Sequence, residues 1–383
     1  MPPKPPDEND QLRTGVLPAD PFEGAMPMST SAEDESDHLE AVEELKRQRV
    51  GSFLASAWER MRARGEGRER PIATPWADVN DALAGGIWPG LHVLVGATGS
   101  GKSQWALQLA LHAALKGTPV LYVGLELGQV DLVARLVGLL TERKWSRLYL
   151  GRDSDGQTSS DELNEIADRH HVDIARLEAA PFHLEVCPPH GWSYEELNRK
   201  ALAMRVLYPE IDERQGSRPI LLVLDFLQLV ASPEGLHEDL RERIGRAAYA
   251  GRAVARDLDM AVLLVSSTAR DNYASLEASE EGGKVAIVPG KTPANRLVGL
   301  GKESGEVEYA ADSVLVFVRG PHTERSDHNK STTAIHIAVA KARAPSEDLL
   351  RRKGWLELAF NGGWFMAVEG LEGGYVPLPR GQR

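Results

Sequence analysis

Residues 96–103 form a glycine-rich segment between an apolar run, residues 91–95, and a stretch of helical periodicity, residues 104–116. The segment matches the pattern G-x-x-x-x-G-K-[ST], in which successive backbone N–H groups and the N-terminus of the following helix bind phosphate oxygens. A strand, such a loop and a helix in this order favour an α/β fold. The residues that we expect to bind the phosphates of ATP are Gly96, Ala97, Thr98, Gly99, Ser100, Gly101, Lys102 and Ser103.

Four polar side chains are candidates for the chemistry on a bound triphosphate. Lys102 is expected to reach the β- and γ-phosphates, and Ser103 to hold Mg²⁺, which neutralises charge developing on the transferred phosphoryl group. Asp225 follows five aliphatic residues, a pattern typical of a buried central strand, and is the expected acidic partner of the Mg²⁺. Glu126 follows a second apolar run and is the predicted base that polarises the attacking water, with helix capping as the alternative role.

From residue 72 onward, short apolar runs alternate with helical stretches, which predicts a mostly parallel sheet with helices on both faces. The expected helices cover residues 104–116, 129–141, 194–207 and 239–258. The expected strands cover residues 91–95, 120–123, 182–186, 220–224, 261–265, 313–318, 334–340 and 356–360.

The N-terminal region differs in composition from the rest of the chain. Residues 1–36 are rich in Pro, Asp, Glu and Ser, and they contain too few apolar side chains to offset the cost of ordering, which predicts a disordered acidic tail. Residues 37–70 are expected to form an amphipathic linker helix, ended by glycines and a proline before the main domain. The tail serves either solubility alone or docking of a partner.

The net charge of −12 does not by itself exclude nucleic acid as a partner. Residues 1–45 hold 12 acidic and 2 basic side chains, so the remaining 338 residues, with 44 acidic and 42 basic, are nearly neutral. Local clusters of Lys and Arg must therefore decide. No apolar run has the length of a membrane span or a signal peptide, and the lone cysteine, Cys187, agrees with a reducing compartment. We expect a cytoplasmic protein without membrane partners.

Five motifs in a fixed order resemble the C-terminal motor domain of the DnaB-type replicative helicases, within the RecA superfamily. The likeness extends from about Thr74 to Met366, and it implies a RecA-like motor domain over residues 71–370 with a C-terminal tail at residues 371–383. The most discriminating motif is LDFLQLV at residues 224–230. The other four are DVNDALAGGIWPG (78–90), VGLEL (123–127), ESGEVEYAADSVLVF (303–317) and AKARAP (340–345).

The resemblance implies further roles for residues far along the chain. Lys341 and Arg343 would be the basic pair that reaches the γ-phosphate of a neighbouring subunit, within a homo-oligomer that is commonly a hexameric ring. Ser266 and Ser267 stand where the family usually has Ser-Gln, so the sensor glutamine is replaced. The family's helical N-terminal collar is not expected in the residues before the motor domain, and the 37–70 helix would instead pack on the adjacent subunit. A loader or another replication partner would bind through this N-terminal segment.

Single-stranded DNA is the expected partner, although the residues that would contact it are weakly indicated. The candidate loop between Arg270 and Lys302 carries four basic groups, Lys284, Lys291, Arg296 and Lys302, which also fit an ordinary solvated loop. Tyr273 is its only aromatic residue, fewer than a base-stacking surface needs. The adjacent His170 and His171 are expected on a solvated surface rather than at a metal.

Three functions fit these observations. The first is a ring-forming ATPase that translocates on single-stranded DNA and separates duplexes in replication. The second is a RecA- or KaiC-like ATPase that remodels a nucleoprotein or protein partner without unwinding. The third, an adaptor that binds ATP only as a structural ligand, is disfavoured because Glu126, Asp225, Lys102 and Arg343 are all retained.

Overall fold

The computed structural model describes residues 32–124, 127–152, 155–186, 192–209, 218–225, 240–267, 287–289, 291–298, 305–325, 330–343 and 345–367. The chain divides into two compact units, residues 1–62 and residues 63–383. Among the described residues, the structure contains no helix whose length and hydropathy match those of a membrane span.

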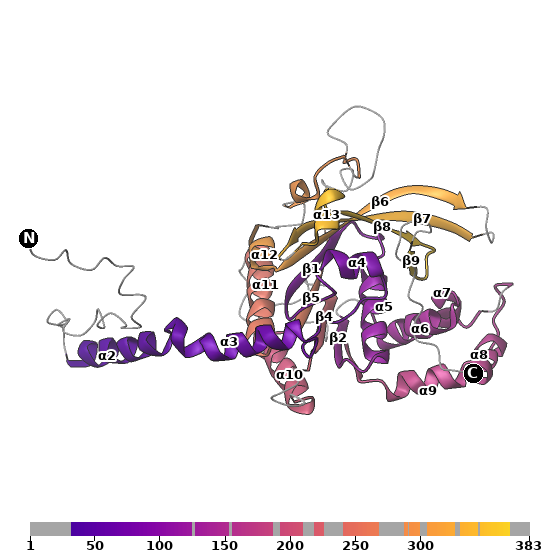
Figure 1. The fold of residues 1–383 in the computed structure, drawn as a ribbon. Helices are drawn as coiled ribbons and strands as arrows, with labels where there is room; N and C mark the ends of the chain where they lie inside the picture. Colours follow the sequence, from indigo (N-terminus) through magenta and orange to yellow (C-terminus); the bar gives the residue numbers. More distant parts are fainter. Residues whose placement is uncertain are drawn as a thin grey trace, which may run out of the picture. The chain divides into compact units, whose positions relative to one another are not determined.

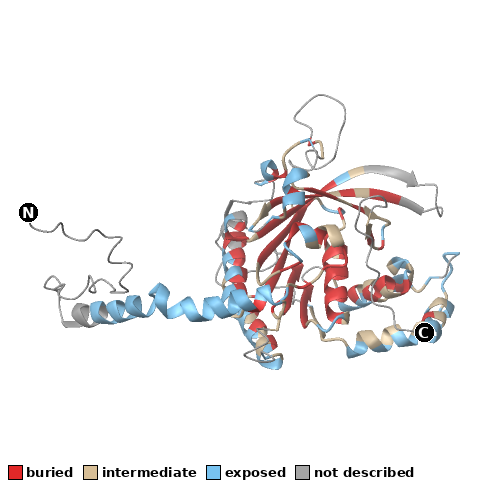
Figure 2. Cartoon of the chain, viewed as in Figure 1, coloured by how far each residue is buried: buried red, intermediate tan, exposed pale blue. Residues whose placement is uncertain are grey.

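The smaller unit contains helix α2 (Ala32–Arg47) and most of helix α3 (Val50–Gly65). The sequence predicts a single amphipathic helix within residues 37–70, and the structure has two helices, separated by a turn at Gln48 and Arg49. Val50 and Gly51 follow the turn, and both have a lower helix propensity than the residues around them. The large apolar side chains of both helices are exposed (Figure 2): Leu39, Val42, Leu45, Val50, Phe53, Leu54, Trp58 and Met61. The predicted tail lies outside the described residues as far as residue 31.

The larger unit is built on one sheet, with nine strands in its described part, in the order β3-β2-β4-β5-β1-β6-β7-β8-β9 (Figure 1). The first six strands in this order are parallel, and the last three run antiparallel to their neighbours. The strands are β1 (Gly90–Gly96), β2 (Val120–Gly124), β3 (Phe182–Val186), β4 (Leu221–Asp225), β5 (Ala261–Ser267), β6 (Ser313–Arg325), β7 (Lys330–Ala342), β8 (Trp355–Phe360) and β9 (Phe365–Ala367).

All eight expected strands are present, which confirms the predicted α/β class with a mostly parallel sheet. Most bounds agree with the expected ranges to within two residues, but β6 and β7 are much longer, because they extend beyond their apolar segments into a long hairpin. The short strand β9 was not predicted, since three residues are too few to show a period.

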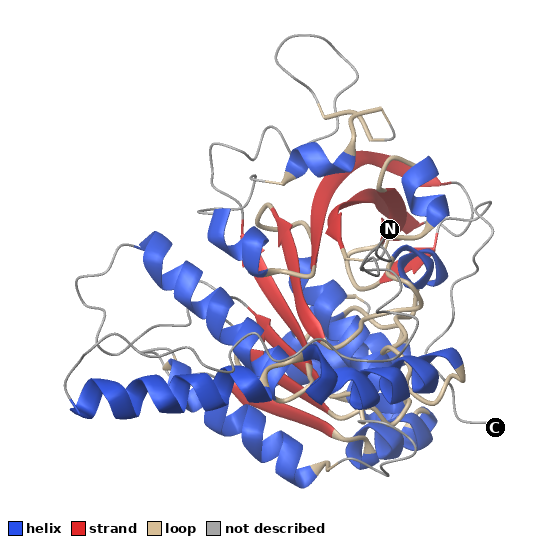
Figure 3. Ribbon diagram, turned by 60° about the vertical axis from the view of Figure 1, so that its left-hand side comes forward, coloured by secondary structure: helices blue, strands red, loops and turns tan. Residues whose placement is uncertain are grey.

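Helices cover both faces of the sheet (Figure 3). On one face, α4 (Ala77–Ala82), α5 (Lys102–Leu115) and α6 (Gln129–Thr141) pack on side chains such as Leu94 and Val223. On the other face, α10 (Tyr194–Leu207), α11 (Leu240–Asp257) and α12 (Gly305–Ala310) pack on alternate residues of the same strands, such as Val93 and Leu222. Both faces of the central strands β2, β4 and β5 are therefore buried, which explains their apolar sequences, whereas β3, at the edge of the sheet, is half-buried and contains His183 and Glu185.

Five short helical elements complete the described part of the larger unit. They were not predicted, because segments of four to nine residues carry too few apolar positions for a period to be read. They are α7 (Trp145–Leu150), α8 (Asp161–Arg169), α9 (His171–Ala179), η4 (Ala294–Leu297) and α13 (Glu347–Arg351).

Candidate active site

The glycine-rich segment connects the end of β1 to the start of α5, as its sequence predicts. Gly99 and Gly101 have φ angles of 78° and 89°, a backbone region that side chains with a Cβ rarely adopt. A Cβ on Gly101 would also lie 2.7 Å from the Phe365 ring, and one on Gly96 would lie 2.9 Å from Ser100 Oγ. A substitution at Gly99 or Gly101 would therefore strain the turn, and one at Gly96 would require neighbouring side chains to move.

Two polar groups in the loop are suited to an anionic ligand. The Lys102 Nζ donates hydrogen bonds of 2.8 Å to the carbonyl oxygens of Gly96 and Ala97, so that the buried ammonium is held inside the loop. The hydroxyl of Ser100 is buried and has no hydrogen-bond partner within the described residues. A buried hydroxyl without a partner costs free energy, and a phosphate oxygen would supply the missing acceptor.

Asp225 ends β4 beside the loop, as predicted, and its carboxylate is buried. One carboxylate oxygen, Oδ1, accepts a 3.0 Å hydrogen bond from Ser103 Oγ. The other, Oδ2, accepts a 2.6 Å hydrogen bond from the hydroxyl of Tyr122, on the adjacent strand β2. Burial, and next the negative charge of Asp225, raise the pKa of Tyr122 well above its usual value, so the phenol stays a donor. Ser103 and Asp225 together offer the hard oxygen ligands that Mg²⁺ prefers.

A pocket of about 390 Å³ opens beside the loop and contains groups that sequence reasoning missed. Arg135, on α6, lies 3.7 Å from the centre of the Trp145 ring and donates a 3.2 Å hydrogen bond to Gln104 Oε1. Nothing in the sequence relates Arg135 to residues of α5 or α7, because only packing of the three helices brings them together. The pocket is lined by Thr98, Gly99, Gly101, Lys102, Ser103, Gln104, Leu127, Arg135, Trp145, Asp225, Val265, Ser267, Phe360 and Gly362.

The predicted base, Glu126, lies outside the described residues. Strand β2, which precedes it, ends at Gly124 directly opposite Asp225 of β4. Strands β2 and β4 therefore end at the same edge of the sheet as the phosphate loop, and the role of Glu126 stays a prediction.

Lys341 and Arg343 lie at the other edge of the sheet. Strand β7 runs antiparallel to β6, so Ala342 pairs with Ser313, at the start of β6, and Ser313 pairs with His92 of β1. Gly96, where the phosphate loop begins, pairs with Phe317, which lies four residues beyond Ser313 along β6. At the usual rise of a strand, these four residues span about 13 Å. The structure thus separates both cations from the phosphate loop of their own chain. Lys341 Nζ donates a 3.4 Å hydrogen bond to Tyr309 O, and Arg343 forms an ion pair with Asp312.

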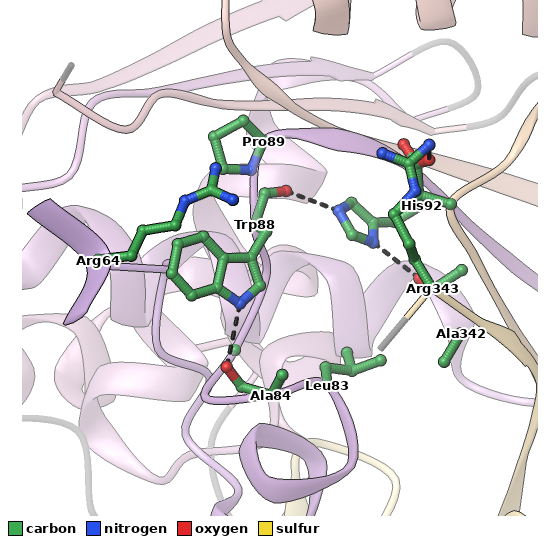
Figure 4. A pocket seen from close by; sticks show the side chains of 11 residues that line it. Arg64, Leu83, Ala84, Trp88, Pro89, His92, Ala342 and Arg343 are labelled. Carbon is green, nitrogen blue, oxygen red and sulfur yellow. Dashed lines mark hydrogen bonds and ion pairs between the residues drawn. The ribbon is translucent and has the colours of Figure 1, made fainter. Parts of the chain in front are cut away.

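A second pocket, of about 330 Å³, is lined in part by Arg343 (Figure 4). The Arg64 guanidinium lies over the Trp88 ring, and buried His92 is also among the residues that line this pocket. His92 Nε2 is 2.8 Å from Trp88 O, which can only accept, so Nε2 carries the proton and Nδ1 accepts from Ser313 Oγ at 2.7 Å. Burial lowers the pKa of His92, in agreement with a neutral ring.

The remaining sequence predictions are placed as follows. Ser266 is buried at the end of β5, and Ser267 lines the pocket beside the phosphate loop. Of the four basic groups in the candidate DNA loop, Lys291 and Arg296 are exposed, whereas Lys284 and Lys302 lie outside the described residues. Within the described residues there is no cluster of three potential metal ligands around His170 and His171 or elsewhere.

Comparison with known proteins gives one family and a set of similar structures. The family model for the DnaB-like helicase C-terminal domain matches residues 72–352. A structure of a DnaB-like replicative helicase, described with its interactions with primase, is 17% identical over 86% of this chain and 71% of that chain, with a TM-score of 0.62. A second solved structure, described as an ATPase domain, is also 17% identical, over 84% of this chain and 99% of that chain, with a TM-score of 0.60. No curated protein sequence matches significantly.

Proposed function

This chain belongs to the DnaB-like helicase C-terminal domain family, and on that premise we propose that it is an ATP-hydrolysing motor. It forms a homo-oligomeric ring, with six subunits as the expected number, that translocates on single-stranded DNA and separates duplexes during replication. The proposal extends the activities named for the similar structures, a replicative helicase and an ATPase domain, to this protein.

The separation of the phosphate loop from Arg343 is the observation that carries the proposal. Each chain has Lys102, Ser103 and Asp225 at one edge of its sheet, and the half-buried Lys341 and the exposed Arg343 at the other edge. Side chains at opposite edges cannot serve one nucleotide. In a ring of like-oriented copies, however, the cationic edge of one copy faces the phosphate loop of the next, so that every site is completed by its neighbour.

The side chains divide the reaction between them. Lys102 leaves the loop carbonyls to bind the β- and γ-phosphates, and Ser103 and Asp225 hold the Mg²⁺ through oxygen. When bound, Mg²⁺ neutralises negative charge on the phosphate oxygens. Glu126 accepts a proton from the attacking water, and Arg343 of the neighbouring copy stabilises the charge of the transition state.

Hydrolysis of Mg-ATP, measured with and without single-stranded DNA and together with particle mass in the presence of nucleotide, tests the proposal. We expect turnover that DNA stimulates and a mass that corresponds to a ring. A monomer with full, DNA-independent turnover would refute both the ring and the DNA partner.

A second candidate function is ATP-driven remodelling of a nucleoprotein or protein without unwinding. It is favoured by Ser267, which lines the nucleotide pocket with a side chain much shorter than the glutamine usual in this family. The two functions differ in a strand-displacement assay: DNA-stimulated turnover that separates no duplex supports remodelling, and strand separation supports the helicase.

A further inference from the structure

Asp312, at the start of β6, is fixed by the backbone around it. Its Oδ2 accepts a 2.8 Å hydrogen bond from the backbone N–H of Leu91. A Cβ on Gly90 would lie 2.4 Å from the same oxygen, so the turn into β1 has room for the carboxylate only because residue 90 is glycine. The next residue, Ser313, is held by its hydrogen bond to His92. The side chain of Asp312 is 13% exposed.

Arg343 is anchored at one end only. Its side chain, labelled in Figure 4, is 71% exposed. Nη2 of Arg343 forms an ion pair with Oδ1 of Asp312. A guanidinium has five N–H donors in a rigid plane, so one contact to a carboxylate leaves donors for a second acceptor. Without such a contact an exposed arginine samples many rotamers, and ordering it has an entropic cost.

We propose that Asp312 is the positioning residue of Arg343: it orients the guanidinium at the edge of the sheet, ready for the γ-phosphate bound by a neighbouring copy of this chain. This inference rests on the proposed function, in which Arg343 acts across a subunit interface. Asp312 itself touches no substrate. Because Asp312 already orders the Arg343 side chain, the arginine loses less entropy when it contacts the transition state. Asp312 should not affect ATP binding by its own chain, because the phosphate loop of that chain lies at the other edge of the sheet.

Asp312 also has a purely structural role to be separated from this one, because it ties the start of β6 to β1. Asp312→Asn separates the two roles. The asparagine keeps an oxygen that accepts from Leu91 N–H, and it removes the charge that faces Arg343. If Asp312→Asn fails to fold, Asp312→Ser, which also keeps an acceptor in a smaller side chain, replaces it.

A double-mutant cycle on ATP turnover is the decisive test. In the otherwise unchanged protein, Asp312→Asn should lower kcat roughly 10- to 100-fold and leave the Kd for ATP unchanged. A loss of this size is expected when a group that acts in the reaction, here the Arg343 guanidinium, is misplaced. In an Arg343→Ala background, measured by single-turnover phosphate release, Asp312→Asn should change the rate less than about twofold. The control is Glu196→Gln, which removes an exposed ion pair with Arg199 on α10 and should leave turnover unchanged.

A second measurement reads the same residue across the interface. Adding Lys102→Ala copies, which retain Asp312 and Arg343, to Asp312→Asn copies should raise turnover, because mixed sites then combine an intact loop with a positioned arginine. An equal loss from Asp312→Asn in both backgrounds, or no gain on mixing despite co-assembly, would overturn the inference. Normal turnover of Arg343→Ala alone would instead refute the proposed role of Arg343.

Discussion

Lys102 lies inside the phosphate loop, where its ammonium donates hydrogen bonds to the carbonyl oxygens of Gly96 and Ala97. We predict that Lys102→Ala weakens nucleotide binding and lowers ATP turnover by at least about 10²-fold. The substitution removes the positive charge that would face the transferred phosphoryl group. Phosphate release and equilibrium binding of ATP measure the two effects. Lys116→Ala is the matched control, because Lys116 is exposed and follows the opposite end of the same helix, α5. Normal turnover in folded Lys102→Ala protein would show that the phosphate loop, residues 96–103, is not the active site.

His112, also on α5, links stability to pH. It is fully buried, and neither ring nitrogen has a hydrogen-bond partner within the described part of the chain. Burial, and next the positive charge of Lys116, lower its pKa from 6.5 to about 4. The folded state therefore keeps the ring neutral while the unfolded state takes up a proton, so stability falls as the pH drops below 6.5 and levels off near 4.

This shift makes a measurable difference in acid. The free energy of unfolding should lose about 2 kcal/mol between about pH 7.5 and about pH 5 through His112 alone. In His112→Leu, which removes the unpaired nitrogens, that part of the pH dependence should disappear, and the difference between the two urea-unfolding series isolates it from other histidines. Parallel series, with no difference that varies with pH, would contradict a neutral buried His112.

At the scale of elements, the two N-terminal helices differ from the tail before them. Removal of residues 1–36 should leave hydrolysis unchanged, because nearly all of that segment precedes the apolar positions of α2. Removal of residues 1–64 should reduce assembly, because α2 and α3 expose a series of large apolar side chains that suit the surface of an adjacent copy. Particle mass and turnover of both truncations measure this. A fully active oligomer that lacks residues 1–64 would show that the helices are not the linker.

At the scale of the whole molecule, the position of Arg343 predicts shared sites. Arg343→Ala should bind ATP normally and hydrolyse it roughly 10³- to 10⁵-fold more slowly, the range for a cationic finger supplied by a second protein. Mixing it with Lys102→Ala copies should restore part of the activity from two inactive parents, because some interfaces then join an intact loop to an intact arginine.

The mixing experiment also has a clear negative outcome. Arg343→Ala could prove inactive, and Lys102→Ala copies could fail to rescue it although the two variants co-assemble. Arg343 would then act within its own chain, for instance by stabilising the fold through its ion pair with Asp312. Near-normal turnover of Arg343→Ala alone would make it an ordinary surface arginine.

The features of this protein that depend on local pattern could be predicted from the amino-acid sequence alone. The phosphate loop, the strand before it and the helix after it were predicted because backbone geometry at Gly99 and Gly101 demands glycine and because buried parallel strands need unbroken apolar runs. For the same reason Asp225 was recognised at the end of β4.

Contacts between residues far apart along the chain could not be predicted from the sequence. Strand order and register place the Tyr122 hydroxyl on Asp225, Arg135 on Trp145 and Asp312 beside Arg343, pairs whose members are not related by any sequence period. The same register separates Arg343 from the phosphate loop of its own chain. Strand pairing in a sheet and the packing of helices on its two faces join residues that are far apart along the chain. They depend on the whole fold, so the type and spacing of nearby residues do not predict them.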